Sequence, residues 1–291
     1  MELTTLTQCL AADALFTWSG GPEIFRIGPL PVRWYGVLFA TGFALGFLIV
    51  KRMFLREGKP LQDLDALLIT LIVSTLIGAR LGHCFFYHPD YYLANPLRIV
   101  EIWKGGLASH GGGLGIITGL WIYSRRRPDQ PFLWLLDRVA VPIALTGSLI
   151  RLGNFFNSEI VGVPTDAPWA IVFARFDDVP RHPAQLYESL SYLTIFTILF
   201  TVYRRKAPND PRGLVSGLFF VLVFSARFLI EFVKRRQADY ASDLPLRVGQ
   251  MLSILPVLAG AALLVYAFTK GSRSGAGNET GAPSPARGSS R

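Results

Sequence analysis

The sequence predicts an all-α polytopic integral membrane protein with about seven transmembrane helices. Of its 291 residues, 51% are hydrophobic, and they gather in long runs rather than in the short periodic patches of a soluble protein. Each run is close to the roughly 20 residues that an α-helix needs to cross a hydrocarbon core. The basic residues, which bring the net charge to +9, fall mainly between the runs. This placement argues against a soluble nucleic-acid-binding protein, although the net charge alone would suggest one.

Seven apolar runs are expected to form the transmembrane helices. They contain Gly, Ser, Thr and Pro, which membrane helices tolerate, and two runs have glycines four residues apart, where neighbouring helices can approach closely. The runs lie near 34–54, 62–82, 107–124, 131–151, 185–203, 213–233 and 248–269. The spaced glycines are Gly42 with Gly46, and Gly111 with Gly115 and Gly119.

The distribution of basic residues predicts which helix ends face the cytoplasm. Basic clusters follow the first, third, fifth and seventh runs, and cytoplasmic loops carry such an excess of Lys and Arg. The clusters are Lys51, Arg52, Arg56 and Lys59; Arg125, Arg126 and Arg127; Arg204, Arg205, Lys206 and Arg212; and Lys270 and Arg273. The N-terminus is therefore expected outside and the C-terminus inside. One loop on the expected outer side disagrees with this orientation, with Lys234, Arg235, Arg236 and Arg247.

One transmembrane catalytic domain, 33–270, is expected, and it includes an outer loop at 158–184. Residues 1–32 should form an outer-face segment, without a cleavable signal peptide, because the first residues lack a basic n-region. The Gly/Ser/Pro-rich segment 271–291 should be a disordered cytoplasmic tail. The two cysteines, Cys9 and Cys84, support neither a disulfide framework nor a metal site, and a single outer bridge between them is left as an alternative.

The stretch LIRLGNFFNSEIVG at the end of the fourth run is the strongest candidate for a functional site. If the helix continues, its polar side chains share one face, because they stand at i, i+3, i+7 and i+8. Charged groups at membrane depth are costly and are therefore functional by default. The alternative is an ion pair between Arg151 and Glu159 that fastens the helix end to the loop. The side chains on this face are Arg151, Asn154, Ser158 and Glu159.

The start of the third run, GGLASHGGGLGIITGL, offers a candidate base. His110 is the titratable group there, and a neutral imidazole can take a proton from a thiol or a hydroxyl. Gly111 and Gly112 leave the backbone bare, so that a ligand or another helix can come close. Alternatively the glycines form a helix-packing seam and His110 only hydrogen-bonds at the interface. For the glycines beyond Gly112 we favour the packing seam.

The stretch RFLIEFVKRR in the sixth run supplies a second arginine at membrane depth. Arg227 and Glu231 stand one turn apart and can pair, although this order is the weaker one. If they do not neutralise each other, Arg227 and Arg151 could together clamp a phosphate, because guanidinium groups bind phosphate oxygens bidentately.

Two further stretches contribute residues at the expected outer side. In RHPAQLYES, Pro183 predicts that a helix begins at or just after it, and His182 is expected to be structural rather than catalytic. In PVRWYGVLFATG, Arg33, Trp34 and Tyr35 have the composition of an interfacial anchor.

Several catalytic motifs are absent from the sequence. It has no H-E-x-x-H, no G-x-S-x-G, no Walker A sequence and no intact G-x-G-x-x-G. No His is followed five residues later by Asp, the arrangement expected of a glycerolipid acyltransferase. Zinc, acyl-serine and nucleotide chemistry are therefore disfavoured, and neither a metal nor a cofactor is expected.

Taken together, these stretches resemble the prolipoprotein diacylglyceryl transferases of the bacterial cytoplasmic membrane. RLGNFFNSEIVG is similar to the family signature, with Arg, Gly, Asn, Asn and Glu in the same order and spacing. Further similar segments follow in family order over most of residues 33–255. They are WYGVLFATG, GARLGHCFFYHPDYYLANPLRIVEIWKGGLASHGG, RHPAQLYES, RFLIEFVK and GQMLSI.

The resemblance implies the first step of bacterial lipoprotein maturation. The family moves a diacylglyceryl group from phosphatidylglycerol to the lipobox cysteine thiol of a prolipoprotein signal peptide, which makes a thioether and releases glycerol phosphate. It implies membrane lipids and these two substrates as partners, no nucleic acid, and a multi-pass location in the inner membrane.

The family's functional residues can be carried over one by one. Its essential His falls on His110, followed by Gly111 and Gly112, and its early Tyr falls on Tyr35. One departure is that some members have a Tyr four residues before the later Arg, where this chain has Val223. The implied catalytic residues are His110, Arg151, Glu159 and Arg227, and the implied substrate-binding residues are Tyr35, Gly111, Gly112, Arg151, Asn154, Arg227 and Glu231.

Three other functions are consistent with charged residues in membrane helices. A small-solute transporter predicts inverted repeats, and the two halves of the chain show no convincing similarity. A lipid-binding or assembly factor would hold a phospholipid without reacting, and turnover would distinguish it. A different phospholipid head-group enzyme would be distinguished by its product.

Overall fold

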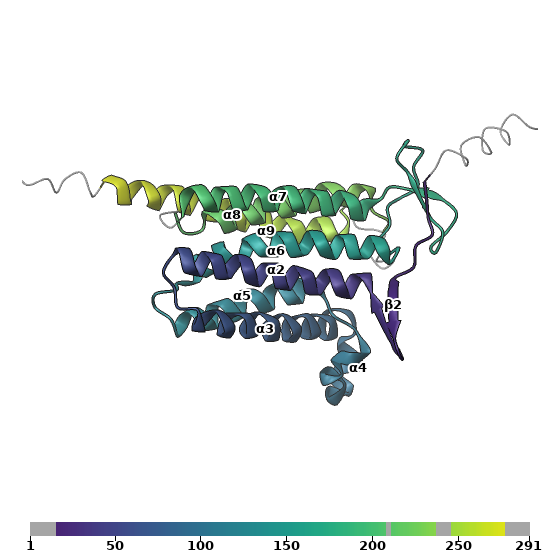
Figure 1. Ribbon diagram of the computed structural model, residues 1–291, viewed down its shortest axis with the longest axis horizontal. Coiled ribbons are helices and arrows are strands. Elements are labelled where there is room, and N and C mark those ends of the chain that lie inside the picture. The colour runs from purple at the N-terminus through teal and green to yellow at the C-terminus, as the bar shows by residue number, and fades with distance from the viewer. Residues whose placement is uncertain (1–15, 208–210, 237–245, 277–291) are drawn as a thin grey trace, which may run out of the picture.

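The computed structural model describes residues 16–207, 211–236 and 246–276, which form a bundle of long helices with small sheets at one end (Figure 1). Cys9, and with it the Cys9–Cys84 bridge, lies outside the described residues, as do the first 15 residues of the predicted outer segment. The last helix continues to Ala276, so it takes in the beginning of the predicted tail, whose remainder also lies outside.

The long helices coincide with the predicted apolar runs. Six helices of the described chain are long and apolar enough to cross a membrane, and a shorter one, α5, stands where the third run was expected. The chain is therefore a multi-pass, predominantly helical membrane protein, while the crossing of α5 stays a prediction. The helices are α2 (Trp34–Arg56), α3 (Gln62–Tyr87), α5 (Ser109–Arg125), α6 (Phe132–Phe156), α7 (Ala184–Lys206), α8 (Leu214–Ile230) and α9 (Val248–Ala276).

The two ends of the bundle are built differently (Figure 1). At the short-loop end, α2 turns into α3, α5 into α6 and α7 into α8, and the predicted cytoplasmic basic clusters lie there. At the sheet end lie the segments that precede α2 and that follow α3, α6 and α8. The basic clusters thus share one end, as the topology prediction requires, and the orientation itself stays a prediction.

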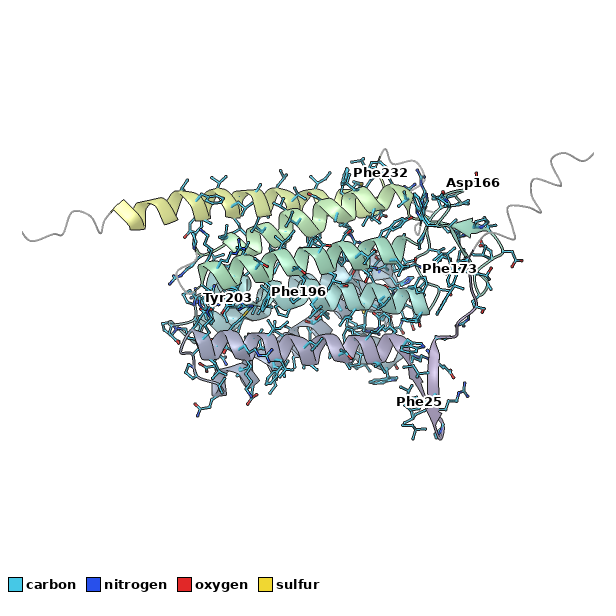
Figure 2. All side chains as sticks on the ribbon, turned by 45° about the horizontal axis from the view of Figure 1, so that its top comes forward. Phe25, Asp166, Phe173, Phe196, Tyr203 and Phe232 are labelled. Carbon is cyan, nitrogen blue, oxygen red and sulfur yellow. The ribbon has the colours of Figure 1, made fainter. Side chains whose placement is uncertain are left out.

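Short strands and helical turns, which the sequence did not predict, build the sheet end. Phe173 is fully buried there, whereas Phe25 points away from the bundle on a hairpin and is 54% exposed (Figure 2). A parallel pair joins β1 to β4, so the chain before α2 is tied to the loop after α6. The elements are β1 (Phe16–Trp18), β4 (Ile171–Phe173) and β5 (Pro180–Arg181) in one sheet, β2 (Glu23–Ile27) and β3 (Leu30–Arg33) in a hairpin, and α4 (Pro89–Ala94), η1 (Pro96–Val100), η2 (Ile102–Lys104) and η3 (Glu231–Val233).

Helix α6 is the central helix of the bundle, since every residue from 134 to 142 is buried. It lies between α2 and α7 (Figure 1) and packs closely against both. A Cβ placed on Gly42 of α2 would come within 2.9 Å of Thr146, and one on Gly46 within 3.2 Å of Pro142. The glycine pair of α2 is therefore a packing seam against α6, as its spacing predicted.

The glycines of α5 form a second seam, against α3. A Cβ on Gly111 would lie 2.8 Å from the Cα of Gly82, and one on Gly115 would lie 3.1 Å from the Cα of Gly78. Gly119 packs in the same way against Ser74. The backbones of α3 and α5 can approach closely because these positions lack side chains, which confirms the packing-seam interpretation for the glycines beyond Gly112.

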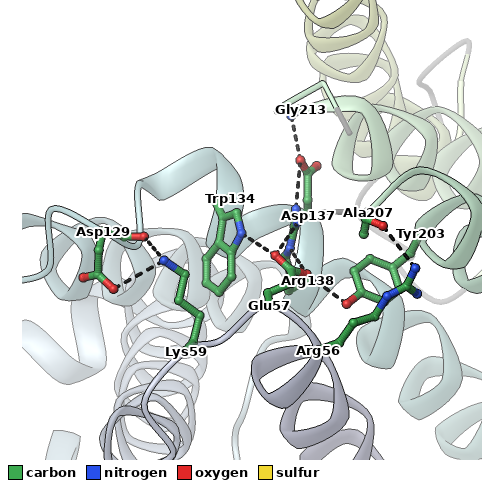
Figure 3. A network of polar contacts seen from close by, with 10 residues as sticks. All are labelled: Arg56, Glu57, Lys59, Asp129, Trp134, Asp137, Arg138, Tyr203, Ala207 and Gly213. Atoms are coloured by element: carbon green, nitrogen blue, oxygen red, sulfur yellow. Dashed lines mark hydrogen bonds and ion pairs between the residues drawn. The ribbon is translucent and has the colours of Figure 1, made fainter. Parts of the chain in front are cut away.

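A buried polar network ties four helices together at the short-loop end (Figure 3). The carboxylate of Glu57 accepts hydrogen bonds from Trp134 at 2.8 Å, Arg138 at 2.8 Å and Tyr203 at 2.8 Å. The carboxylate of Asp137 caps the beginning of α8, because it accepts from the backbone N–H groups of Gly213 at 2.7 Å and Ser216 at 2.8 Å. Charges at this depth are thus paired within the protein.

Candidate active site

The polar signature stretch ends α6 with a left-handed turn. The helix ends at Phe156, and the backbone N–H of Glu159 donates to the carbonyl oxygen of Asn154 at 2.9 Å. That of Ser158 donates to Phe155 at 2.9 Å, which completes a Schellman motif. Ser158 and Ile160 have φ angles of 56° and 57°, uncommon for residues other than Gly. The prediction that the helix carries Ser158 and Glu159 on one face with Arg151 is therefore wrong.

The turn nevertheless brings the signature side chains together. The side-chain amide of Asn154 donates to Glu159 at 3.2 Å, and its carbonyl oxygen accepts from Arg151 at 3.3 Å. Asn157 also donates to Glu159, at 3.2 Å. A chain of contacts thus runs from Glu159 through Asn154 to Arg151.

Arg151 forms its ion pair with Glu188 of α7. Its Nε atom lies 3.0 Å from Oε2 of Glu188, whose side chain has no exposed surface, while the Arg151 side chain is 14% exposed. The alternative, an ion pair between Arg151 and Glu159, is therefore not formed. The guanidinium lies inside the bundle, because α6 and α7 are packed along this face.

Lys234, from the loop after α8, completes the ion cluster. Its Nζ atom lies 2.8 Å from Oε1 of Glu188 and 3.4 Å from Oε2 of Glu231. The backbone on both sides of Lys234 pairs with the loop after α6. The N–H of Val163 donates to the carbonyl oxygen of Val233 at 2.8 Å, and the N–H of Arg235 donates to that of Val161 at 3.1 Å. This pairing carries Lys234 into the protein, where its side chain is 6% exposed.

Two of the four basic residues that opposed the predicted topology, Lys234 and Arg247, are held by contacts within the protein, whereas Arg235 and Arg236 are exposed. Lys234 neutralises buried carboxylates, the guanidinium of Arg235 lies 5.0 Å from the ring centre of Phe176, and Arg247 donates to the backbone carbonyls of Glu231 and Lys234. The positive-inside rule concerns basic residues in loops that remain in the aqueous phase. Lys234 and Arg247 therefore weigh little against the predicted orientation, while the exposed Arg235 and Arg236 still oppose it.

Arg227 is the uncommitted cation of the site. Its side chain is half-buried and makes no hydrogen bond or ion pair with any residue that the structure describes. The expected pair with Glu231 is not formed, because α8 ends at Ile230 and Glu231 turns to Lys234. Arg227 lies close enough to Glu188 and His110 to interact with both electrostatically.

Tyr35 closes the site from α2. Its ring lies against the signature helix, where a Cβ on Gly153 would come within 2.9 Å of the tyrosine Cδ2. Its hydroxyl interacts electrostatically with Arg151 and Glu159. The neighbouring Trp34 stacks on Phe156, with 4.7 Å between ring centres. Tyr35 thus belongs to the polar cluster as well as to the helix interface.

His110 faces the site from the start of α5 with a free nitrogen. Its Nε2 atom is buried and has no hydrogen-bond partner among the described residues. The ring packs edge-on against Phe86 at 5.0 Å and lies 5.9 Å from Tyr87. A buried nitrogen without a partner is unusual in a folded protein, and this one is available to accept or donate a hydrogen bond.

Gly111 and Gly112 are both buried against α3, and close helix packing accounts for the lack of a side chain at Gly111, where a Cβ would clash with the carbonyl oxygen of Gly78. A Cβ on Gly112 would lie 3.5 Å from Thr75, whereas one on Gly113 would meet nothing within 4 Å. Contact between substrate and the first two glycines stays a prediction.

Further polar atoms without partners lie around the signature turn. Gln185 of α7 is fully buried and donates to the backbone carbonyl of Glu159 at 2.6 Å, while its own Oε1 has no partner among the described residues. Ser158 Oγ and Asn157 Oδ1 are also buried and have no hydrogen-bond partner among the described residues. The turn is therefore lined with acceptors and donors that a polar ligand could satisfy.

His182 is held by structural contacts, as the sequence predicted. Its Nδ1 atom lies 3.1 Å from the hydroxyl of Tyr187, and its backbone pairs with Gly162 and Val163. Among the described residues no three His, Cys, Asp or Glu side chains gather as metal ligands would.

A family model described as "Prolipoprotein diacylglyceryl transferase" matches residues 22–266, which include both the signature turn and His110. The chain belongs to this family. Membership makes it a transferase of lipoprotein biosynthesis.

Named relatives in the family are similar over nearly the whole chain. The phosphatidylglycerol–prolipoprotein diacylglyceryl transferase of Chloroherpeton thalassium is 54% identical over 253 residues, which are 87% of this chain and 94% of that protein. Proteins of the same name from Tolumonas auensis and Porphyromonas gingivalis are 48% and 44% identical. These matches cover 88% and 89% of this chain and 99% and 96% of the two relatives.

Among the residues expected from the resemblance to prolipoprotein diacylglyceryl transferases, the structure gathers Tyr35, Arg151, Asn154 and Glu159 in direct contact or close electrostatic range. Arg227 and His110 interact with each other electrostatically across the same region. Glu231 is connected to this group of residues through Lys234, which also pairs with Glu188.

Sequence reasoning missed three buried residues of the site: Glu188, Gln185 and Lys234. Glu188 and Gln185 stand in the predicted first turns of α7, and a carboxylate at that depth was itself a signal that an intramembrane cation must lie opposite.

Proposed function

We propose that this chain transfers the diacylglyceryl group of phosphatidylglycerol to the cysteine thiol in the lipobox of a prolipoprotein signal peptide, in the bacterial cytoplasmic membrane. The observation that carries the proposal is the pair of intramembrane arginines at one polar cluster. Arg151 is paired with Glu188, and Arg227 makes no direct ion pair with a described residue. Phosphatidylglycerol brings one phosphate, which such a pair of guanidinium groups can bind through charge-assisted hydrogen bonds.

The reaction forms one bond and breaks one. The thiolate sulfur attacks the carbon of the diacylglyceryl group that carries the phosphate. A thioether forms, and the bond between that carbon and the phosphate oxygen breaks. The bonding electron pair stays on the phosphate oxygen, so negative charge grows on the departing glycerol phosphate. Fixed cations in a water-poor site stabilise this charge, and removing one such contact typically costs about 3 kcal/mol, or roughly two orders of magnitude in rate.

His110 is the proposed acceptor of the thiol proton. A free cysteine has a pKa of about 8.5, and only its thiolate attacks carbon effectively. The unpaired Nε2 of His110 is available to accept a hydrogen bond from the thiol. The nearby positive charge of Arg227 favours the thiolate once the proton has left.

The remaining site residues position the two arginines and the lipid. Glu159 acts through Asn154, which accepts a hydrogen bond from Arg151 and donates one to Glu159. Tyr35 presents its hydroxyl to the same cluster. Glu231 neutralises Lys234 and so leaves Arg227 unpaired. Gly111 and Gly112 let the start of α5 pack against α3, which positions His110 at the site.

The domain 33–270 contains all of these residues and is the proposed catalytic domain, with segment 1–32 on the outer face. Seven crossings, with the N-terminus outside, would place the sheet end and its signature turn at the outer side of the membrane. Substrate prolipoproteins would then meet the site after their signal peptides have inserted.

The purified protein in detergent, phosphatidylglycerol and a synthetic lipobox peptide provide the test, with the peptide mass measured by mass spectrometry. A diacylglyceryl increment on the cysteine is expected, and it should be absent from a peptide whose cysteine is alkylated. Phosphatidylethanolamine in place of phosphatidylglycerol tests the head group. Lipid binding without any modification of the peptide would contradict the proposal and favour a lipid-binding factor.

A further inference from the structure

The packing of α2 against α6 fixes the depth of the site in the bundle. Along the antiparallel pair, position 35 lies against 153, 42 against 146 and 46 against 142. The same register places Arg151 level with Val37 of α2. Arg151 stands five residues before the end of α6 at Phe156, which corresponds to about 7 Å at 1.5 Å per residue. A phosphate bound there lies well below the end of the helix.

A groove between α2 and α3 begins just below that level. It has a volume of about 730 Å³, and nearly all of its surface is apolar. On α2 it runs from Phe39, two residues below the level of Arg151, to Leu48. On α3 it is lined by Leu68, Ile72 and Leu76. It can form because α2 and α3 touch at few points, whereas α2 packs on α6 and α3 packs on α5.

The groove is continuous with the polar cluster through a row of aromatic rings. Tyr35, Phe39 and Phe43 stand four residues apart on one face of α2, with ring centres separated by 6.3 Å and 5.0 Å. The first ring lies against Gly153 of the signature helix, and the other two line the groove. A molecule held at the arginines can therefore reach the groove along this row of rings.

The length and lining of the groove suit a hydrocarbon chain. From Phe39 to Leu48 the groove is about 14 Å long at 1.5 Å per residue, and its lining is almost wholly apolar. An extended acyl chain can lie along it without burying a polar group.

The depth of the phosphate explains why a dedicated groove is needed. A lipid drawn about 7 Å into the bundle places its chain ends beyond the middle of a hydrocarbon core about 30 Å thick, in space that lipids of the other leaflet normally fill. The groove offers that space along the side of the bundle, between α2 and α3. Its one charged lining residue, Asp65, lies near the short-loop end and limits the apolar length.

We propose that the groove between α2 and α3 is the subsite for an acyl chain of the phospholipid whose phosphate lies at Arg151 and Arg227; this inference rests on the proposed function. The groove confers a preference for long acyl chains, since each buried methylene contributes to binding until the chain reaches Asp65. Lipids that merely surround the protein in the membrane would show no such preference.

The kinetic test fills the groove with a larger side chain. Ala44 is an exposed groove residue, so Ala44→Phe should block the groove with little effect on the α2–α6 seam. The expected result is at least a tenfold rise in KM for dipalmitoyl phosphatidylglycerol and less than a twofold change for the dihexanoyl lipid. Ala262→Phe on the exposed face of α9, outside the groove, is the matched control and should change neither. An equal effect on both lipids, or none, would overturn the subsite.

A crosslinking test does not depend on turnover or on the variant's folding. Dipalmitoyl phosphatidylglycerol with a diazirine near the chain end is irradiated with the wild-type protein, and the labelled peptides are identified by mass spectrometry. Adducts concentrated between Phe39 and Leu48 and between Leu68 and Leu76, and displaced by unlabelled lipid, are expected. Adducts spread evenly over lipid-facing helices such as α9 would overturn the subsite. If the protein transfers no diacylglyceryl group but the groove is still labelled, the proposed function is refuted and the acyl-chain subsite is not.

Discussion

The Nε atom of Arg151 lies 3.0 Å from Oε2 of Glu188, and Nζ of Lys234 lies 2.8 Å from the other oxygen of the same carboxylate. One fully buried acid therefore holds two cations, one from α6 and one from the loop after α8. This arrangement holds Arg151 in place and leaves Arg227 without a direct ion pair among the described residues. A site with one anchored and one free guanidinium is suited to an anion that must enter and leave.

Replacing Glu188 should weaken both folding and turnover. In Glu188→Gln, Arg151 and Lys234 lose their common counter-charge, and the loss of one member of a buried ion pair typically costs about 3–5 kcal/mol. We expect a lower thermal midpoint in detergent and a fall in kcat, because Arg151 is no longer held. Glu188→Asp keeps the charge and should recover part of kcat. Equal kcat for the wild type and the Gln variant would show that the pair does not position Arg151.

Substitution of His110 should change the pH dependence of the reaction. His110→Gln keeps a polar side chain of similar size at this position but cannot accept the thiol proton at neutral pH. The variant should lose at least tenfold in rate at neutral pH and lose the acid limb of the wild-type profile, measured between about pH 5 and pH 9. A variant with the wild-type rate and an unshifted profile would mean that the thiol loses its proton without His110.

The helical part of the fold could be predicted because a span-length apolar run is a property of consecutive residues. All seven runs became helices, and α7 begins at Ala184, next to Pro183, as predicted. The short strands β1 and β4 could not be found in this way. They are only three residues long, and their pairing joins parts of the chain more than 150 residues apart.

The contacts of the signature were harder to predict than its identity. Helical periodicity assigned Glu159 to the face of Arg151, but the chain reverses at Ser158 and Ile160, which adopt a conformation uncommon for their residue types. A tertiary contact supports the turn, because Gln185 donates to the Glu159 carbonyl at 2.6 Å. The spacing of residues along one helix does not encode a contact with another helix. The ion pair of Arg151 with Glu188 of α7 could therefore be found only in the structure.

At the short-loop end, Glu57 should matter for stability rather than for chemistry. Its carboxylate accepts hydrogen bonds from Arg138, Trp134 and Tyr203 (Figure 3). The signature turn lies at the other end of the bundle, after α6. Glu57→Ala leaves the buried Arg138 without this partner and should cost about 3–5 kcal/mol, seen as a lower midpoint of unfolding in detergent. The transfer rate per folded molecule should stay within about twofold of the wild type, whereas a larger loss would link this network to the site.

The Asp177–Arg181 pair should make the sheet end sensitive to acid. The hydrogen bond from the Arg181 guanidinium holds the pKa of Asp177 below its ordinary value. A carboxylate with a lowered folded-state pKa stabilises the protein above its unfolded pKa of about 3.9, and the stabilisation is lost as the pH falls through the lower folded value.

Asp177→Asn tests this relationship. The variant should unfold at a lower temperature than the wild type at neutral pH, and the difference should vanish near pH 2–3, measured by thermal unfolding in detergent. A difference that stays constant over the whole range would show that Asp177 does not contribute through its charge. Asp166→Asn, another acid at the sheet end, serves as a control for the loss of a carboxylate (Figure 2).

The most direct test of the two-arginine site is the transfer rate of Arg227→Ala. Because Arg227 makes no ion pair with a described residue, its removal should leave the thermal midpoint close to that of the wild type. The rate of diacylglyceryl transfer to a lipobox peptide, measured by mass spectrometry on correctly inserted protein, should fall by roughly two orders of magnitude. A variant that is correctly inserted and transfers at nearly the wild-type rate would contradict the account, since the phosphate would then be held without Arg227.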